Sequence, residues 1–382
     1  MLRDKRIIIV LHSLKVGGAE RQALLLGHHL LHEQGAKVEV WAFCHPGPVA
    51  KLCEEYAIPW RIVPVEQRQN NHILFFKESL KLAWLLRQAQ ANVILPYTIY
   101  PNALCGFAWR WTGAQLCIWN QRGGGAERIR PTLEHWATRL TPKFISNSQH
   151  GADFLVQTFK VNPTNIKIIY NGLKLAQPEA DRMTWRSQLE VNDTCFLACM
   201  VANLHSGKDH VTLLKAWKIV VDQLERIDRS AVLLLAGRFD ATHKNLTTLA
   251  FDLKLGTKVR FLGEVKDISG LLNAVDLGIL TSPYKDYEGC PNAVLEYMGC
   301  GLAVAGTDVS GIRQAVGPDG YPYLSPLGNT EALAGSILKL AMDHELRLKL
   351  GIANRKRVEM IYNPLQMCQK TVAFITHNLD SK

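Results

Sequence analysis

Two glutamates stand eight positions apart in the stretch YEGCPNAVLEYMG, which covers residues 287–299. Because proline suits the first turn of a helix, we expect a helix to begin at Pro291 or Asn292. Glu288 then lies in the loop before the helix, and Glu296 lies within about a turn of its start. Free amides at a helix start attract anions, and carboxylates accept hydrogen bonds from hydroxyl groups. The stretch therefore predicts a site for a phosphate attached to sugars.

Three further loops follow predicted strands and carry groups that suit the same ligand. Gly17 and Gly18 in KVGGAER allow close backbone approach to an anion, although the pair also fits an ordinary tight turn and fails the G-x-G-x-x-G spacing. Lys208 in ANLHSGKDH is a compact cation beside a helix start, and alone it would be interpreted as a solvated loop lysine with Asp209 as the N-cap of the helix. Arg238 in GRFD could reach a phosphate or simply be exposed. Together the four loops indicate a nucleoside diphosphate sugar.

Apolar strands and amphipathic helices alternate along the chain, which is typical of parallel sheets. The pattern predicts an α/β protein with two Rossmann-like doubly wound domains facing a central cleft, and loops at the carboxyl ends of strands bind ligands in such sheets. We place the first domain at 1–170, the second at 171–360 and a last helical segment at 361–382. Strands are expected at 5–14, 37–43, 92–98, 115–122, 143–148, 195–203, 231–237, 258–264, 277–282 and 302–307, and helices at 19–35, 75–90, 132–140, 150–159, 209–224, 245–255, 268–275, 329–362 and 364–379.

Composition limits the class of protein. A chain of 382 residues with 47% hydrophobic content can bury a large core, and its size favours two domains. Its nine cysteines form no CxxC pair, which indicates core residues in a reducing compartment instead of a disulfide framework or zinc site. No apolar run approaches the roughly eighteen residues that span a bilayer. We therefore expect a soluble or peripheral cytoplasmic protein whose basic, apolar start is a buried strand and not a signal peptide.

The net charge of +10 is unevenly distributed. Residues 1–168 hold 20 Lys and Arg against 11 Asp and Glu, whereas the remainder holds 24 against 23. A basic half can meet anionic lipid, nucleic acid or a phosphorylated acceptor, or it can be a solvated surface. The stretch Trp109-Arg110-Trp111 lies in this half and suits a lipid surface, although its tryptophans suit a core equally well.

The segment from Glu288 to Glu296 resembles the Glu-x7-Glu motif of retaining glycosyltransferases of family 4, which have the GT-B fold. The similarity extends through EGCPNAVLEYMGCGLAVAGTDVSGIRQAV. Further blocks that resemble the family occur in order along almost the whole chain: GGAER, KFISNS, KIIYNG, ANLHSGKDH, LLLAG and VRFLGEVKD. The resemblance implies a final helix that crosses back to the first domain, a role that residues 364–379 could fill.

The resemblance also implies roles for individual residues. Lys208 would contact the donor diphosphate, Glu288 the hydroxyls of the transferred sugar and Glu296 the ribose hydroxyls, with Glu288 and Lys208 as the catalytic pair. Gly17 and Gly18 would cover the diphosphate from the first domain. The backbone of the strand end at 261–265, which includes Val265, would meet the base, and the sugar and phosphate would be lined by Gly289, Cys290, Pro291, Asn292 and Ala293.

This sequence departs from the family pattern at two places. Asn203 stands where the family often has an arginine, and Arg238 is the candidate that compensates for the missing charge. Tyr97 and Thr98 stand where the family usually has a histidine beside the sugar. We place both with Arg122 on the acceptor side, while Arg122 also fits contact with the diphosphate or a flexible surface turn.

The implied reaction is retaining transfer of a hexosyl or N-acetylhexosaminyl group from a nucleotide sugar, for which we expect a UDP-sugar. The acceptor would be a glycan or lipid-linked glycan of cell-surface polysaccharide or glycolipid synthesis. We expect no cofactor and no metal, because a helix end with Lys208 can replace a magnesium ion. The basic first domain suggests peripheral contact with anionic lipid at the inner face of the cytoplasmic membrane, and nucleic acid is not expected. A sugar-nucleotide 2-epimerase of the same fold and a non-catalytic binding module remain as alternatives.

Overall fold

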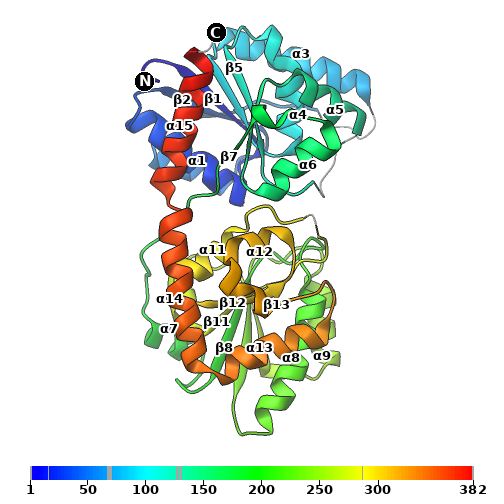
Figure 1. The fold of residues 1–382 in the computed structure, drawn as a ribbon, viewed down its shortest axis with the longest axis vertical. Coiled ribbons are helices and arrows are strands. Elements are labelled where there is room, and N and C mark those ends of the chain that lie inside the picture. The colour runs from blue at the N-terminus through cyan, green and yellow to red at the C-terminus, as the bar shows by residue number, and fades with distance from the viewer. Residues whose placement is uncertain are drawn as a thin grey trace. The chain divides into compact units, whose positions relative to one another are not determined.

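The computed structural model divides the chain into two compact units (Figure 1). Unit 1 comprises Met1–Gly172 and Pro364–Lys382, and unit 2 comprises Leu173–Asn363. The structure describes residues 2–15, 17–66, 71–125, 129, 131–285 and 287–380. Val16, in the first glycine loop, and residues 126–128, in the stretch after Arg122, therefore lie outside the described residues.

Unit 1 is built on a seven-stranded parallel sheet with the strand order β3-β2-β1-β4-β5-β6-β7. Its strands are β1 (Arg6–Ser13), β2 (Lys37–Cys44), β3 (Trp60–Ile62), β4 (Val93–Pro96), β5 (Leu116–Gln121), β6 (Lys143–Ser146) and β7 (Ile166–Ile168). Its helices are α1 (Gly18–His32), α2 (Pro48–Glu55), α3 (His72–Gln88), α4 (Ile99–Ala108), α5 (Pro131–Leu140), α6 (Gln149–Phe159) and α15 (Pro364–Asp380), with short 3-10 helices η1 (Trp109–Trp111) and η2 (Pro163–Asn165).

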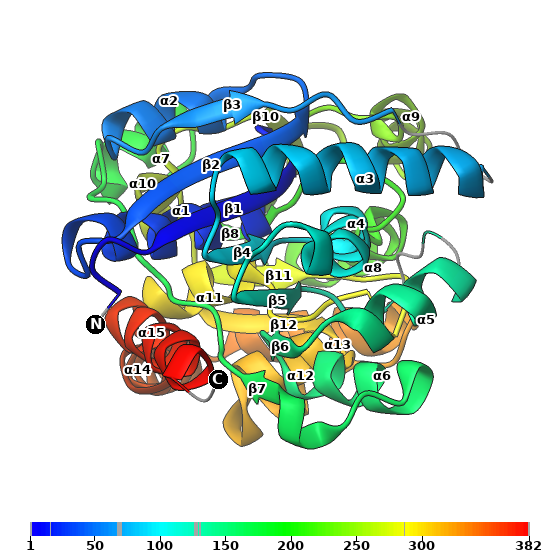
Figure 2. The ribbon, with the colours of Figure 1, turned by 90° about the horizontal axis from the view of Figure 1, so that it is seen from above.

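Both faces of this sheet are covered. Figure 2 shows α3, α4, α5 and α6 on one face and α1, α2 and α15 on the other. Successive residues of β1 point to opposite faces, so Ile7 and Ile9 pack in the core beneath α1 and α15, while Ile8 and Val10 pack in the core beneath α3 and α4. This is why the first strand is a continuous apolar run instead of an alternating one.

Helix α15 belongs to unit 1, although α14 (His344–Ile361) directly before it belongs to unit 2. Its buried residues Met367 and Ile375 lie in the same core as α1. Near the point where the chain leaves unit 1, the side chain of Gln22 donates to the carbonyl of Gly172 and accepts from its amide, both at 2.9 Å. These contacts fix the end of unit 1 against helix α1.

Unit 2 repeats the architecture with a six-stranded parallel sheet in the order β10-β9-β8-β11-β12-β13. Its strands are β8 (Phe196–Val201), β9 (Ala231–Ala236), β10 (Val259–Gly263), β11 (Leu277–Leu280), β12 (Ala303–Thr307) and β13 (Leu324–Ser325). Its helices are α7 (Arg182–Gln188), α8 (His210–Glu225), α9 (His243–Asp252), α10 (Ile268–Ala274), α11 (Asn292–Gly299), α12 (Ser310–Val316), α13 (Thr330–Met342) and α14, with η3 (Gly256–Lys258) and η4 (Pro318–Tyr323).

The predicted fold class, two doubly wound α/β domains, is confirmed by the two sheets. The order of strands reverses between β1 and β4 in unit 1 and between β8 and β11 in unit 2. Loops at such a reversal diverge at the carboxyl ends of the strands and leave room for a ligand. In the part of the chain that the structure describes, no helix is both long enough and apolar enough to cross a bilayer.

Several elements are absent from the sequence prediction. Helix α4 was missed because Pro101 and Gly106 interrupt its pattern; Pro101 lies in the first turn, and Gly106 packs against Thr141, where a Cβ would not fit. Helix α7 lies between the helix expected at 150–159 and the strand expected at 195–203, where the sequence pattern indicates no element. The remaining missed elements are short or lie at sheet edges: α2, β3, β7, α12 and β13.

Candidate functional site

The loop after β8 holds Lys208 in a tight turn. The amide of Lys208 donates to the carbonyl of His205 at 3.1 Å, and the amide of Gly207 donates to Nδ1 of the same histidine at 3.0 Å. Asp209 is the N-cap of α8, since its side chain accepts from the amide of Thr212 at 3.0 Å. One interpretation of the sequence makes Asp209 the N-cap of the helix, and the structure contains this cap directly after the Lys208 turn. The turn and the cap fix the direction of the lysine backbone.

Glu288, in the loop after β11, forms an ion pair with Lys208. The Nζ atom of Lys208 donates to Oε1 of Glu288, and the side chains are only 15% and 8% exposed, respectively. The same Nζ lies 5.6 Å from the ring centre of Tyr287. Strands β8 and β11 are neighbours at the reversal of strand order, which explains why residues eighty positions apart meet. The site thus contains a largely buried, internally neutralised pair of charges.

The backbone beneath Glu288 is supported by the start of α12. A Cβ at Gly311 would lie 2.5 Å from the carbonyl oxygen of Glu288 and 2.6 Å from that of Gly289. Only a glycine therefore lets α12 approach the loop this closely. Gly311 positions the backbone of Glu288 without contacting its carboxylate, and the signal in the sequence is a glycine in the first turn of α12, four residues after β12 ends.

Helix α11 begins at Asn292 with Pro291 as its N-cap residue, as the sequence predicts. Glu296 lies on this helix and is only 9% exposed. The next residue, Tyr297, is fully buried; its hydroxyl donates to the carbonyl of Ile279 in β11 at 3.1 Å, and burial raises the pKa of this phenol. This anchor holds α11 on the sheet, so that Glu296 and the helix start occupy fixed positions.

The short segment between the two glutamates runs directly from the ion pair into the helix. Gly289 and Pro291 are buried, and Cys290 and Ala293 are half-buried. The segment therefore presents its backbone at the same edge of the sheet as the Lys208 loop. The structure brings together Lys208, Glu288 and the residues up to Glu296, in agreement with the predicted position of these groups at strand ends.

The side chain of Asn203 contacts the backbone of Arg238. The side-chain oxygen of Asn203 accepts from the amide of Arg238 at 3.0 Å, which ties the loops after β8 and β9 together. The Arg238 guanidinium donates from Nη2 to Oδ2 of Asp240 at 3.2 Å, and both side chains are more than a third exposed. The charge of Arg238 is thus matched locally, and its expected contact with a phosphate stays a prediction.

Val265 lies half-buried in the loop after β10, two strands from β8. Next to that strand end an aromatic cluster was missed by the sequence analysis. The rings of Phe239 and His243 are stacked with centres 3.9 Å apart, and His243 meets Phe261 edge-on at 5.7 Å. Aromatic rings at strand ends suit stacking against the face of a nucleobase. Two phenylalanines at the ends of successive predicted strands were the available signal.

The glycine loop of unit 1 opens helix α1. Gly17 is the N-cap in an extended conformation, and its carbonyl accepts from the amide of Arg21 at 3.2 Å. Gly18 is the first helical residue. The loop therefore ends in the start of a helix, which is the feature that the predicted contact with an anion requires.

Tyr97, Thr98 and Arg122 meet at the ends of β4 and β5. The Arg122 guanidinium lies 4.5 Å from the ring centre of Tyr97 and donates to the side-chain oxygens of Asn171 at 3.1 Å and Asn120 at 3.3 Å. Burial raises the pKa of Tyr97, and the nearby guanidinium partly opposes this shift. A flexible surface turn at Arg122 does not fit this half-buried environment. The two asparagines were not identified from the sequence.

Thr98 has an unusual backbone, with φ 68° and ψ 169°. A positive φ is rare for a β-branched residue and is sterically costly by about 1–3 kcal/mol. The threonine begins α4, where the chain turns sharply from the end of β4. Such conformations persist where the surrounding structure enforces them, and they are frequent at ligand sites.

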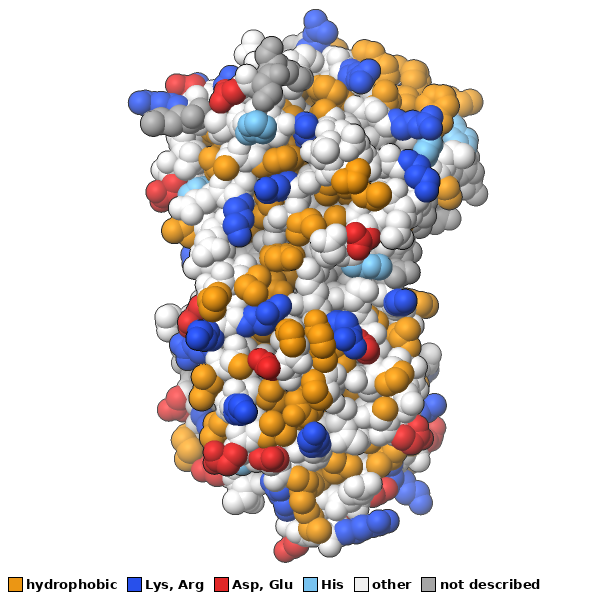
Figure 3. All heavy atoms as spheres, in the orientation of Figure 1, with side chains coloured by type: hydrophobic (Ala, Val, Ile, Leu, Met, Phe, Trp, Pro, Cys, Tyr) orange, Lys and Arg blue, Asp and Glu red, His pale blue; other side chains and the backbone are white. Residues whose placement is uncertain are grey.

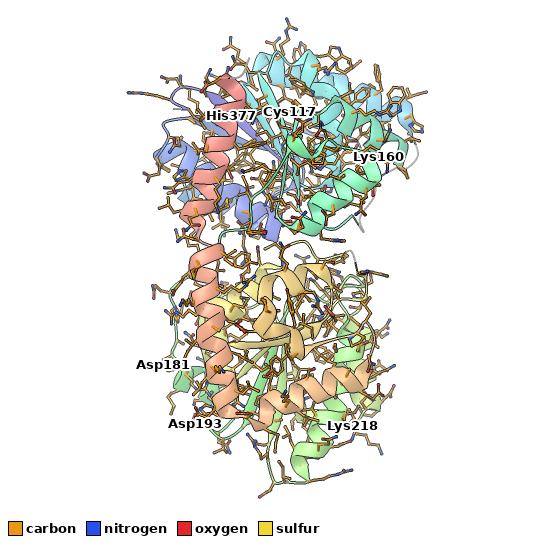
Figure 4. The ribbon with its side chains drawn as sticks, viewed as in Figure 1. Cys117, Lys160, Asp181, Asp193, Lys218 and His377 are labelled. Atoms are coloured by element: carbon orange, nitrogen blue, oxygen red, sulfur yellow. The ribbon has the colours of Figure 1, made fainter. Side chains whose placement is uncertain are left out.

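The nine cysteines are all free thiols. Cys195 and Cys199 are buried in the core, as predicted. Burial also raises the pKa of Cys117, which lies within the sheet of unit 1 (Figure 4). Among the described residues, no group of three or more His, Cys, Asp or Glu side chains is arranged to hold a metal ion.

Two family models match the chain along most of its length. The model described as Glycosyltransferase Family 4 matches residues 16–177, and the model described as Glycosyl transferases group 1 matches residues 196–343. The chain belongs to glycosyltransferase family 4. For this family 4 protein, the second model covers both the Lys208 loop and the two glutamates, and the first covers Arg122.

Curated relatives of this family 4 protein are moderately similar. An N-acetylgalactosamine-N,N'-diacetylbacillosaminyl-diphospho-undecaprenol 4-alpha-N-acetylgalactosaminyltransferase of Campylobacter jejuni is 26% identical over 54% of this chain and 54% of its own. An N-acetyl-alpha-D-glucosaminyl L-malate synthase of Bacillus anthracis is 25% identical over 51% of this chain and 49% of its own. The chain thus spans about half the length of these relatives.

Solved structures share the fold over nearly the whole chain. HepE of Anabaena, in complex with UDP and glucose, has a TM-score of 0.83 and 20% identity, covering 97% of this chain and 99% of that one. At this identity the likeness shows the fold alone. The neighbours are GT-B glycosyltransferases, so the predicted GT-B fold is confirmed.

Proposed function

We propose that this protein transfers a hexosyl or N-acetylhexosaminyl group from a UDP-sugar to a glycan or lipid-linked glycan, with retention of anomeric configuration. The observation that carries the proposal is the buried Lys208–Glu288 pair beside the start of α11. The Campylobacter jejuni relative is named for a diphospho-undecaprenol acceptor, and HepE was solved with UDP and glucose. The complex of HepE supports a UDP-sugar donor for this chain, and the name of the Campylobacter jejuni relative supports a lipid-linked acceptor.

In the proposed mechanism the ion pair is exchanged when the donor binds. A diphosphate carries more negative charge than one carboxylate, so the Nζ atom of Lys208 moves its hydrogen bonds to the phosphate oxygens. Glu288 is then free to accept hydrogen bonds from hydroxyls of the sugar. Because both side chains are largely buried, their charges act in a medium of low dielectric constant, where such interactions are strong.

Bond cleavage moves negative charge onto the UDP leaving group and positive charge onto the sugar ring. Lys208 and the amides at the start of α11 stabilise the first, and the carboxylate of Glu288 stabilises the second. Glu296 accepts hydrogen bonds from the ribose hydroxyls, and Gly17 with Gly18 covers the diphosphate. The acceptor hydroxyl attacks from the face that the UDP leaves, and its proton passes to the departing diphosphate oxygen. We propose that this chemistry proceeds without a metal ion or other cofactor.

The acceptor is bound by unit 1 in this proposal. Among the described residues, the Arg122 guanidinium has neutral partners, namely the side-chain oxygens of Asn120 and Asn171 and the phenol of Tyr97, so its positive charge is retained for a ligand. A phosphate or diphosphate of a lipid-linked acceptor suits a planar guanidinium supported in this way. Tyr97 and Thr98 complete this acceptor side.

The donor is tested by a thermal-shift screen of the full chain with UDP-, GDP- and ADP-sugars, for the wild type and Lys208→Gln. We expect a UDP-sugar at about a hundred times its dissociation constant to stabilise the wild type by about 3 kcal/mol, and to stabilise Lys208→Gln much less. Lys258→Gln is the matched control, because Lys258 pairs with Glu225 in the same unit but on the surface. Stabilisation by none of the nucleotide sugars contradicts the proposal.

A further inference from the structure

Helix α3 of unit 1 is apolar on both of its faces. The inward face contributes Phe75, Leu82 and Leu86 to the core. The outward face carries Ile73, Phe76, Leu80 and Trp84, which are 84%, 47%, 43% and 60% exposed. The spacing of three or four residues places these four side chains along one line of the helix. A helix at the surface of a soluble domain normally has a polar outer face, so this stripe requires a partner.

The apolar surface continues from α3 onto its neighbours. Trp111 in η1 is 45% exposed and Trp136 in α5 is 64% exposed. Phe107 of α4 joins them to the stripe, with its ring centre 5.8 Å from that of Phe76 and 5.7 Å from that of Trp111. Figure 3 shows hydrophobic side chains gathered over the part of unit 1 where Figure 1 places α3 and α5. Of the Trp109-Arg110-Trp111 stretch, only Trp109 is core, and its indole donates to the carbonyl of Leu140.

A groove of about 610 Å³ opens within this surface. It lies between the first turns of α3 and α5, with Phe107 of α4 at its side. Ile73, Phe76, Leu133 and Trp136 line it, and its walls are almost entirely apolar. A groove of this size is wide enough for part of a hydrocarbon chain. The exposed apolar surface of α3 therefore includes a groove in addition to its row of exposed side chains.

The charged residues of these helices are sorted by sign. Both acidic residues of α3, α4, η1 and α5 are buried: Glu78 is 5% exposed and Glu134 is 0% exposed. The cations of the same helices are exposed, and they are Lys77, Lys81, Arg87, Arg110 and Arg139. Of these, Lys81 lies 3.6 Å from a carboxylate oxygen of Glu78 and donates to the carbonyl of Pro64 at 2.7 Å. An exposed aromatic and aliphatic stripe bordered by cations is the pattern of a helix that lies in the interface of an anionic bilayer.

We infer that the surface formed by α3, η1 and the start of α5, hereafter the α3 face, docks onto an anionic phospholipid bilayer. Ile73, Phe76, Leu80 and Trp84 enter the interfacial region, the groove receives an acyl chain, and the bordering cations contact lipid headgroups. A polar protein partner would leave the apolar groove exposed, and a second copy would bring like charges together. This docking would place the proposed transfer reaction at a membrane surface. It rests on the proposed function only in assuming that the acceptor is lipid-linked.

The test is co-sedimentation of the full chain with vesicles of phosphatidylcholine alone and of phosphatidylcholine with phosphatidylglycerol. We expect binding to the anionic vesicles, with a blue shift of tryptophan fluorescence. The variant Phe76→Ser/Trp84→Ser should lower the partition coefficient at least tenfold. Lys77→Gln/Arg87→Gln should lower it about fivefold for each neutralised charge. The matched control is Phe251→Ser in α9 of unit 2, a single side chain that is 82% exposed, which should leave vesicle binding unchanged.

Stabilisation by UDP is measured on the same samples, because donor binding uses none of the substituted residues. Retained stabilisation together with lost vesicle binding supports the inference and shows that the variants are folded. Wild-type protein that does not sediment with anionic vesicles overturns the inference and leaves the proposed function standing. Equal binding of the wild type and Phe76→Ser/Trp84→Ser overturns it as well. A concentration-dependent dimer that the double substitution abolishes, without vesicle binding, assigns the α3 face to a second copy and contradicts the inference.

Discussion

The carboxyl ends of the two sheets carry cations in opposite electrostatic situations. In unit 2, Lys208 is paired with the buried carboxylate of Glu288. In unit 1, Arg122 lies over the ring of Tyr97, and its partners among the described residues are neutral side chains. The same topology, a parallel sheet with a reversal of strand order, thus presents a neutralised pair at one edge and a charged guanidinium at the other.

The difference suits two ligands with different requirements. A donor diphosphate must be held tightly during bond cleavage and then released as UDP, and a lysine that returns to Glu288 allows both. An acceptor phosphate needs attraction and orientation but no chemical change, which a fixed guanidinium provides. The chain-level charge agrees with this division, because residues 1–168 hold 20 Lys and Arg against 11 Asp and Glu. Substitutions at four positions, Glu288, His210, Lys208 and Arg122, test the comparison.

The substitution Glu288→Gln should have the largest effect. The amide keeps the shape of the side chain but removes the charge that stabilises the developing positive charge on the sugar, so kcat should fall by about a thousandfold. Binding of UDP should stay within about twofold of wild type or become tighter, because the competitor for Lys208 is weakened. Steady-state transfer kinetics and UDP titration measure the two effects. A kcat within tenfold of wild type would remove Glu288 from the catalytic pair.

Acid should destabilise the edge of unit 2 through His210, the buried first residue of α8. Burial lowers the pKa of this imidazole from 6.5 to about 4, so between these values the unfolded chain binds a proton that the folded chain does not. Stability is therefore complete above pH 6.5 and declines as the pH falls toward 4, by about 3 kcal/mol in total.

The variant His210→Gln removes this titrating imidazole. Its free energy of unfolding should therefore fall by about 3 kcal/mol less than that of the wild type between pH 6.5 and pH 4. The same substitution at exposed His344 in α14 is the control. An unchanged slope in His210→Gln would show that other groups cause the loss of stability.

Breaking the ion pair from the lysine side should lower stability as well as donor affinity. Lys208→Gln leaves the Glu288 carboxylate buried without its cation, which should cost about 2 kcal/mol, or a fall in Tm of about 4–8 °C. The double variant Lys208→Gln/Glu288→Gln should recover most of that loss, because no buried charge is left. Additive losses in the double variant would show that the two side chains are not energetically coupled.

The smallest effect is expected at the edge of unit 1. Arg122→Gln should raise the acceptor KM about tenfold, because one charge-assisted contact is lost, and should leave kcat within about threefold. Arg122→Lys should not restore the KM, since a lysine cannot contact Asn120 and Asn171 in the plane that the guanidinium occupies. A change in donor KM without a change in acceptor KM would move Arg122 to the donor side.

Local features of the site were predictable from the sequence. The proline at 291 marks the start of α11 because a residue without an amide hydrogen fits only the first turn, and the helix begins one residue later. The Lys208 loop was found because a glycine and a capping aspartate follow an apolar strand. These signals lie within a few residues of the feature that they predict.

Contacts between distant residues could not be predicted. The pairing of Lys208 with Glu288 depends on β8 and β11 being neighbours, which no local pattern reveals. One local contact was missed as well: Arg238 was predicted to compensate for missing charge, but its guanidinium pairs with Asp240 two positions later. The α3 face was hidden for a related reason: periodicity shows which positions of a helix are apolar, and only the fold shows which of them remain exposed.

The central claim is that Lys208 holds the donor diphosphate and Arg122 does not. Titration calorimetry of UDP into the wild type, Lys208→Gln and Arg122→Gln tests it most directly, with Lys258→Gln as a surface control. We predict that Lys208→Gln weakens UDP binding by at least about tenfold, the loss of one charge-assisted contact, while Arg122→Gln and Lys258→Gln remain within about twofold. Equal affinities for the wild type and Lys208→Gln, or a tenfold loss in Arg122→Gln alone, would contradict the account.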